Sequence, residues 1–302
     1  MLRWTVWTYQ EGEGWSPDQQ LPLNLSDFGP SLAGGSSLDC VFAGAKGDSR
    51  LYLTRYDHIN GWIVAQALPN HYSAAAPAVA RYQNKLYCVH RGGKDDEQLW
   101  WATYGDQGSG VNEWSADQSF PAHKSSTTPA LAVFQDKLYC VHRGAVDDAQ
   151  MYWTCWDGSS WSADRPVGGW TSSHAPALAV YRDTRRQPCL VCVHRLDDGS
   201  LNLIRFTGSD WRPGLNDYPT TLPGKTAKAP ALAVFGGDLH CVQRGNGDDK
   251  NLYISTMVQG SHSWYGPLRM GESVASAEGA SLTVYRAPDG TKDQLFCMHR
   301  GV

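Results

Sequence analysis

The segment Leu86-Tyr87-Cys88-Val89-His90-Arg91-Gly92 decides the fold, because the chain repeats it at a regular spacing. An identical copy occupies residues 138–144, varied copies occupy residues 190–195, 239–245 and 295–301, and a weaker one occupies residues 38–44. The cysteine of each copy marks the spacing: Cys40, Cys88, Cys140, Cys192, Cys241 and Cys297. Units of about fifty residues that recur in this way predict an array of repeated supersecondary structures.

Each unit contains four segments with the composition of β-strands. In the third unit they are residues 129–134, residues 138–142, residues 150–156, and a fourth segment that begins at Trp161 and ends near Pro166. Turns rich in Gly, Asp and Gln separate these short runs of apolar and aromatic residues, a pattern typical of β-hairpins. Four-stranded units of this length are the blades of β-propellers. We therefore predict an all-β fold, a six-bladed β-propeller of four-stranded blades.

The two ends of the chain supply complementary halves of one blade. Residues 3–9 and Gly14-Trp15-Ser16 match the third and fourth strands of a unit, whereas the last residues match its second strand. The N-terminal strands should therefore complete the C-terminal blade, which removes the exposed edges of an open sheet. We expect a single domain over residues 1–302, with blades at about 30–69, 77–121, 129–168, 176–218, 230–271, and 280–302 plus 2–22.

Composition and charge exclude several classes of protein. The 302 residues are 41% hydrophobic and 19% charged, which is typical of a globular protein and not of a disordered one. A net charge of −4 argues against a nucleic-acid partner, since such proteins need a basic surface. No apolar run is long enough for a transmembrane segment. The first residues lack the pattern of a signal peptide, so we expect a cytoplasmic protein or one released by a non-classical route.

Two sets of repeated residues are interpreted as scaffold. A tryptophan opens the fourth strand of every unit, and we expect it to pack between neighbouring blades: Trp15, Trp62, Trp114, Trp161, Trp211 and Trp264. The six repeated cysteines lie between apolar residues and are expected to be buried. Cys189 and Cys192 form a C-x-x-C pair, but no second ligand pair with zinc-binding spacing accompanies it. We predict no metal and no cofactor.

Arginine and aspartate flank the loop between the second and third strands, and two interpretations of them stay open. They could form a structural ion pair that closes the loop, or a polar pocket beside each blade. A guanidinium fork with carboxylate acceptors suits the hydroxyl groups of a sugar. The residues that we predict to bind ligand in these loops are Arg91, Asp95, Asp96, Arg143, Asp147, Asp148, Arg195, Asp197, Asp198, Arg244, Asp248 and Asp249.

Polar residues also gather in the expected crossovers from the fourth strand of one blade to the first strand of the next. These crossovers should share one face with the Arg–Asp loops, and we expect them to carry His71, His123, Lys124, Ser125, Ser126, Trp170, Ser172, Ser173 and His174. His123 and His174 are added to the predicted ligand-binding set. The second-strand histidines, such as His90 and His142, are interpreted as packed groups between blades.

Enzymatic activity is an alternative with less support in the sequence. A catalyst on a symmetric scaffold needs a carboxylate pair or a nucleophile at one particular place, and none stands out from the repeat. The arginines sit at one repeated position and should be spread around the ring. The enzyme that remains as the less supported alternative is a sialidase-like or lyase-type one, which would use charged residues at the channel mouth. Because no catalytic group stands out from the repeat, we predict no catalytic residues.

The turn Trp156-Asp157-Gly158-Ser159-Ser160-Trp161 resembles the shortened Asp-box turn of sialidase-like and lectin propellers. The six-unit ring resembles the six-bladed fucose lectins of the Aleuria type and is similar in repeat style to the seven-bladed Photorhabdus-type lectins. This resemblance implies a multivalent lectin that binds glycans or glycoconjugates, with cell-surface binding as a possible role. A protein-interaction or toxin-targeting propeller is the alternative from another class.

Overall fold

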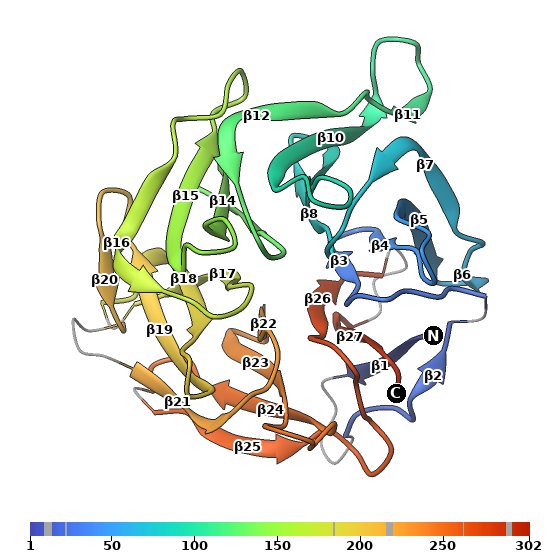
Figure 1. The fold of residues 1–302 in the computed structure, drawn as a ribbon. Coiled ribbons are helices and arrows are strands. Elements are labelled where there is room, and N and C mark those ends of the chain that lie inside the picture. The colour runs from blue at the N-terminus through green and yellow to red at the C-terminus, as the bar shows by residue number, and fades with distance from the viewer. Residues whose placement is uncertain (9–13, 22, 184, 216–219, 262, 288–291) are drawn as a thin grey trace.

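The computed structural model shows six β-sheets arranged around a central channel (Figure 1). It describes residues 1–8, 14–21, 23–183, 185–215, 220–261, 263–287 and 292–302. The described residues contain no helix that could cross a membrane. The six sheets confirm the predicted fold class, an all-β six-bladed propeller. Parts of the predicted blades, such as residues 9–13 and 216–218, lie outside the described residues.

Each blade runs outward from the channel in four steps. The innermost strands are β3 (Ser31–Ala33), β8 (Ala78–Tyr82), β13 (Ala130–Phe134), β17 (Ala177–Arg182), β22 (Ala231–Phe235) and β26 (Ser281–Tyr285). The second strands are β4 (Leu38–Ala43), β9 (Lys85–Arg91), β14 (Lys137–Arg143), β18 (Pro188–Arg195), β23 (Asp238–Arg244) and β27 (Gln294–Arg300). The third strands are β5 (Arg50–Asp57), β10 (Gln98–Asp106), β15 (Gln150–Trp156), β19 (Ser200–Phe206), β24 (Leu252–Met257) and β1 (Leu2–Thr8).

The outermost strands differ from the prediction. They are β6 (Gly61–Trp62) with β7 (Gln66–Tyr72), β11 (Asn112–Trp114) with β12 (Gln118–Lys124), β16 (Arg165–Thr171), β20 (Trp211–Pro213) with β21 (Thr220–Lys225), β25 (Tyr265–Arg269) and β2 (Gln19–Gln20). In the third blade Trp161 makes only an isolated bridge to Trp156, and the strand proper runs from Arg165 to Thr171. The expected end near Pro166 was therefore wrong. As a consequence His71, His123, Lys124 and Trp170 lie in outer strands and not in the crossovers.

The ring closes through strands from both ends of the chain. The N-terminal strand β1 pairs antiparallel with β27, from Leu2 opposite Arg300 to Thr8 opposite Gln294. The two termini lie close together in Figure 1, and the Gly301 N–H donates to the Met1 carbonyl over 2.9 Å. The predicted completion of the last blade by the N-terminal strands is confirmed.

The hydrophobic core is divided among the six interfaces between blades. Every buried cluster combines residues of two neighbouring blades, as where Leu203 of the fourth blade packs with Leu232 and Met257 of the fifth. The strand-four tryptophans join these clusters: Trp161, for example, packs at 4.5 Å between ring centroids from Phe120 of the preceding blade. The six repeated cysteines are fully buried free thiols, and burial raises their pKa values. Blade contact by tryptophan and burial of cysteine both follow the sequence prediction.

Candidate functional site

The repeated arginines bind backbone carbonyls where the crossovers meet the second strands. Nε donates to the carbonyl of a crossover Ser or Thr in four blades: Arg143 to Ser172 at 3.0 Å, Arg195 to Thr226 at 2.7 Å, Arg244 to Ser276 at 3.0 Å and Arg300 to Ser26 at 2.9 Å. In the second blade, Arg91 Nε instead donates to the Asp96 carbonyl over 3.2 Å.

The same guanidinium groups also reach the crossover that enters their own blade. Arg143 Nη1 donates to the Ser126 hydroxyl, and Arg195 Nη1 donates to the Ser173 hydroxyl over 2.6 Å. One arginine thus ties two successive crossovers together, using the fixed fork of donors that a guanidinium offers. The loop-closing interpretation assumed a bond to the loop carboxylates, whereas the described bonds of Arg91, Arg143, Arg195 and Arg244 go to carbonyl and hydroxyl oxygens.

The second aspartate of each loop has two structural partners. Asp148 Oδ1 accepts the Gln150 N–H over 2.9 Å, and Asp148 Oδ2 accepts the Tyr152 hydroxyl over 2.8 Å. Corresponding aromatic–aspartate pairs occur at Tyr52–Asp48 (2.6 Å), Trp100–Asp96 (2.9 Å) and Tyr253–Asp249 (2.8 Å). In the fourth blade Asp198 instead binds Ser200 and Lys225, and these bonds hold its pKa well below the usual value.

A glycine makes room for this aspartate. A Cβ built on Gly144 would lie 2.4 Å from Asp148 Oδ2, and one on Gly92 would lie 2.1 Å from Asp96 Oδ2. The Gly of the repeated His-Arg-Gly segment is therefore required by the close approach of the carboxylate. The aromatic partner four residues after the aspartate was missed in the sequence, although Tyr52, Trp100, Tyr152 and Tyr253 share that spacing.

The first aspartate of each loop faces solvent. Asp95, Asp147, Asp197 and Asp248 are exposed, so their carboxylates are accessible acceptors. Loops of adjacent blades also touch, because the Val146 N–H donates to the Glu97 carboxylate over 2.9 Å. An exposed carboxylate thus recurs in the Arg–Asp loops of four blades.

The two predicted ligand-binding histidines occupy different environments. His123 is 1% exposed, with Nδ1 at 2.6 Å from the Pro121 carbonyl and Nε2 at 3.2 Å from the Ser162 carbonyl of the next blade. It is a buried group between blades. His174 lies at the channel mouth, where burial and the nearby cations Arg195, Lys228 and Arg143 lower its pKa to about 4.

The second-strand histidines pair with an aspartate that the sequence analysis did not single out. His90 Nε2 lies 3.0 Å from Asp117 Oδ1, and the same pair recurs as His142–Asp164 and His299–Asp18, each at 3.1 Å. Each aspartate is the last residue of a Trp-x-x-Asp sequence, which was the available signal. Among the described residues no group of three or more His, Cys, Asp or Glu side chains is arranged to hold a metal ion.

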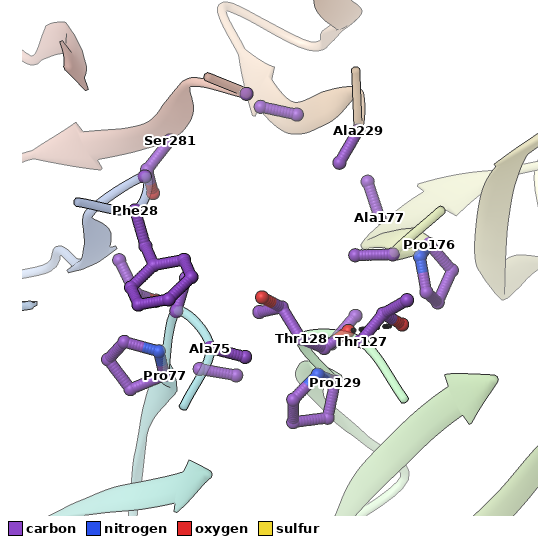
Figure 2. Close-up of a pocket in the computed structure, with 18 of the residues that line it drawn as sticks. Phe28, Ala75, Pro77, Thr127, Thr128, Pro129, Pro176, Ala177, Ala229 and Ser281 are labelled. Carbon is purple, nitrogen blue, oxygen red and sulfur yellow. Dashed lines mark hydrogen bonds between the residues drawn. The ribbon is translucent and has the colours of Figure 1, made fainter. Parts of the chain in front are cut away.

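A cavity of about 380 Å³ lies at the mouth of the central channel (Figure 2). Its wall is built from the segments that lead into the inner strands, which in three blades are Ala-Pro: Ala76-Pro77, Ala175-Pro176 and Ala229-Pro230. At its rim each crossover contributes one residue at an equivalent position: Phe28, Ala75, Thr127, His174, Lys228 and Glu278. Unlike the arginine loops, this rim does not repeat the same side chain.

The sheets define a six-bladed β-propeller. No family model matches the sequence, and the comparison with curated proteins gives no match. Solved structures do match. The chain is similar to AofleA from Arthrobotrys oligospora, with a TM-score of 0.61, 13% identity, and coverage of 98% of this chain and 82% of that one.

Two further structures bind fucose according to their descriptions. The fucose-specific lectin from Aleuria aurantia gives a TM-score of 0.59 at 10% identity and covers 91% of this chain and 96% of that one. SapL1 lectin, solved with alpha methyl fucoside, gives 0.59 at 12% identity, with 88% and 87% covered. At these identities the likeness establishes the shared six-bladed fold.

Proposed function

We propose that this protein is a multivalent carbohydrate-binding protein that acts without catalysis, with sites repeated between blades on the crossover face. The aromatic–aspartate pair, present in four blades, is the observation that carries the proposal. An aromatic ring packs against the apolar C–H face of a sugar, and carboxylates accept bonds from its hydroxyls. The fucose-binding neighbours of the same fold support this class of ligand.

The aspartates have separate tasks in this proposal. The second one holds the aromatic ring: its bond to the Tyr152 hydroxyl raises the pKa of that tyrosine, and Tyr253 is held likewise by Asp249. The exposed one, such as Asp147, is available to the sugar. Arg143 and its counterparts position the loops through their carbonyl bonds.

Repetition of weak sites gives useful affinity. A shallow site typically binds a monosaccharide with a dissociation constant on the order of 1 mM, or about −4 kcal/mol. Several such sites on one rigid face raise the avidity for a dense glycan surface by ~10²–10⁴-fold. A cell surface rich in glycans is therefore the partner that we propose.

A glycan array tests the proposal directly. We expect the wild-type protein to bind at least one glycan class at high density. The variants Trp100→Ala, Tyr152→Ala and Tyr253→Ala should each weaken binding, and the triple variant should lose tenfold or more because avidity depends on the number of sites. Tyr265→Ala is the matched control, since this tyrosine is 59% exposed but has no loop aspartate four residues before it.

Thermal unfolding of each variant separates a lost site from a lost fold. The proposal fails if no glycan binds at high density, or if a folded triple variant binds as well as the wild-type protein does. Retained binding by the Tyr265→Ala variant would attribute the loss to the paired aromatic residues.

A further inference from the structure

The rim of the channel mouth breaks the sixfold symmetry in side chains but not in backbone. At each rim position a Ser or Thr hydroxyl two residues earlier binds the backbone of the rim residue. The bonds to the carbonyl are Ser73 to Ala75 at 2.8 Å, Ser125 to Thr127 at 2.9 Å, Ser172 to His174 at 2.7 Å, Thr226 to Lys228 at 3.0 Å and Ser276 to Glu278 at 2.8 Å. In the first blade Ser26 accepts the Phe28 N–H over 3.1 Å.

These bonds fix the backbone whatever the side chain is. The rim side chain is therefore free to differ from blade to blade, and it does. Phe28 and Ala75 make one apolar arc, while His174, Lys228 and Glu278 make a polar arc on the other side of the ring. Figure 2 shows Phe28 and Thr127 on different sides of the cavity, from different blades. A symmetric scaffold thus carries one asymmetric site.

Below the rim, apolar side chains of the innermost strands line the cavity. Five leucines and one valine, one from each innermost strand, line both this cavity and the cavity at the opposite end of the channel: Leu32, Val79, Leu131, Leu178, Leu232 and Leu282. This leucine ring forms the floor of the mouth cavity. The volume of about 380 Å³ falls within the range of small-molecule sites, roughly 300–1,000 Å³.

Cations outnumber carboxylates around the polar arc. Lys228 Nζ lies 2.9 Å from Glu278 Oε2, and Glu278 also lies 3.9 Å from Arg300 Nη1. Arg143 and Arg195 add further positive charge, which contributes to the lowered pKa of His174. Because an ammonium group has three donors, Lys228 can donate to Glu278 and to a second anion at the same time.

We propose that the channel mouth binds one small amphipathic anion, a carboxylate attached to an apolar ring. The carboxylate lies at Lys228 and His174, and the ring lies against Phe28 and the alanine wall, above the leucine ring. The burial of apolar surface and one charge-assisted contact together provide the affinity. This site is single and central, and it does not depend on the glycan sites proposed at the Arg–Asp loops.

Isothermal titration calorimetry of the full chain with benzoate, benzyl alcohol and benzylamine tests the proposal. We expect benzoate to bind at one site per chain and at least tenfold more tightly than benzyl alcohol, with benzylamine weakest. Lys228→Met should weaken benzoate binding tenfold or more, whereas Glu278→Gln should strengthen it. Lys225→Met is the matched control, because this exposed lysine, three residues earlier at the end of β21, pairs with Asp198 and does not line the mouth cavity.

A blocking variant tests the position. Thr127→Phe should abolish benzoate binding without loss of fold, because Phe28 shows that the same backbone position accepts this side chain. The proposal is overturned by equal binding of benzoate and benzyl alcohol, by wild-type affinity in folded Lys228→Met or Thr127→Phe, by several equivalent sites, or by no binding at roughly 10 mM benzoate. The triple aromatic variant should still bind benzoate, which separates this result from the glycan test.

Discussion

At the scale of single residues, the histidine–aspartate pair is kept or lost as a unit in five of the six blades. The second, third and sixth blades have both members, as in His142–Asp164. The first blade has Phe42 with Ala65, and the fifth has Gln243 with Pro267 at the corresponding positions. His194 alone keeps the histidine without the aspartate, since Gly214 stands in its place. The pattern indicates that the aspartate serves to satisfy a buried imidazole.

His194 therefore makes the protein sensitive to acid. The ring is fully buried, Nδ1 donates to the Thr171 carbonyl over 2.8 Å, and Nε2 has no partner among the described residues. Burial lowers its pKa from 6.5 to about 4, so the unfolded chain binds the proton more readily than the native state does. Stability should be complete above pH 6.5 and fall as the pH drops toward 4, by about 3 kcal/mol from this residue.

Urea unfolding at a series of pH values measures this effect. His194→Gln, which copies the residue of the fifth blade, should reduce the slope of the stability profile between pH 6.5 and 4, and His174, whose pKa is also lowered, should account for part of the slope that is left. His58→Gln serves as the control, because this histidine is exposed in a turn. An unchanged profile for His194→Gln would contradict the assignment.

At the scale of elements, the arginines hold the crossovers and so the channel rim. Arg195 binds the Thr226 carbonyl and the Ser173 hydroxyl, which belong to the crossovers on either side of its blade. Arg195→Lys keeps the charge but loses the fork, and it should cost about 1.5–3 kcal/mol in the free energy of unfolding. Arg182→Lys, an exposed change in the same blade, should cost little. Urea unfolding distinguishes this role from a purely ligand-binding one, in which glycan binding alone would fall.

Single elements also show what the sequence pattern could not locate. Turn residues and apolar runs placed the inner three strands well, as with residues 150–156, which match β15. The outer strand was misplaced because it bends: the register between β15 and β16 shifts between Gln150 and Tyr152. A bulge leaves no composition signal, so His123 was assigned to a crossover although it lies buried in β12.

At the scale of the whole molecule, repetition predicts the ring but conceals the site. The spacing of the repeated cysteines predicted the number of blades, and the match of residues 3–9 to a third strand predicted the closure by β1, since similar segments occupy equivalent places. The rim residues Phe28, His174 and Lys228 also occupy equivalent places, but their side chains differ, and in the sequence they look like ordinary variation. The shared hydroxyl bonds to their backbone reveal the alignment, and the Ser or Thr two residues before each of them was the available signal in the sequence.

Closure by strands from both ends should stabilise the ring, because the hydrogen bonds between β1 and β27 hold the two ends of a long chain together.

Two circular permutants test this contribution to stability. Both join Val302 to Met1 through Val-Asp-Asp-Ala, the residues that the third blade has at this place in its loop. One opens between Asn24 and Leu25, so that every blade is continuous and no ladder joins the ends. The other opens after the exposed Val146 and keeps a shared blade. We expect the first to be less stable by roughly 2 kcal/mol or more in urea unfolding, with the same circular dichroism spectrum. Equal stability of the two would show that packing between blades, and not the shared blade, closes the ring.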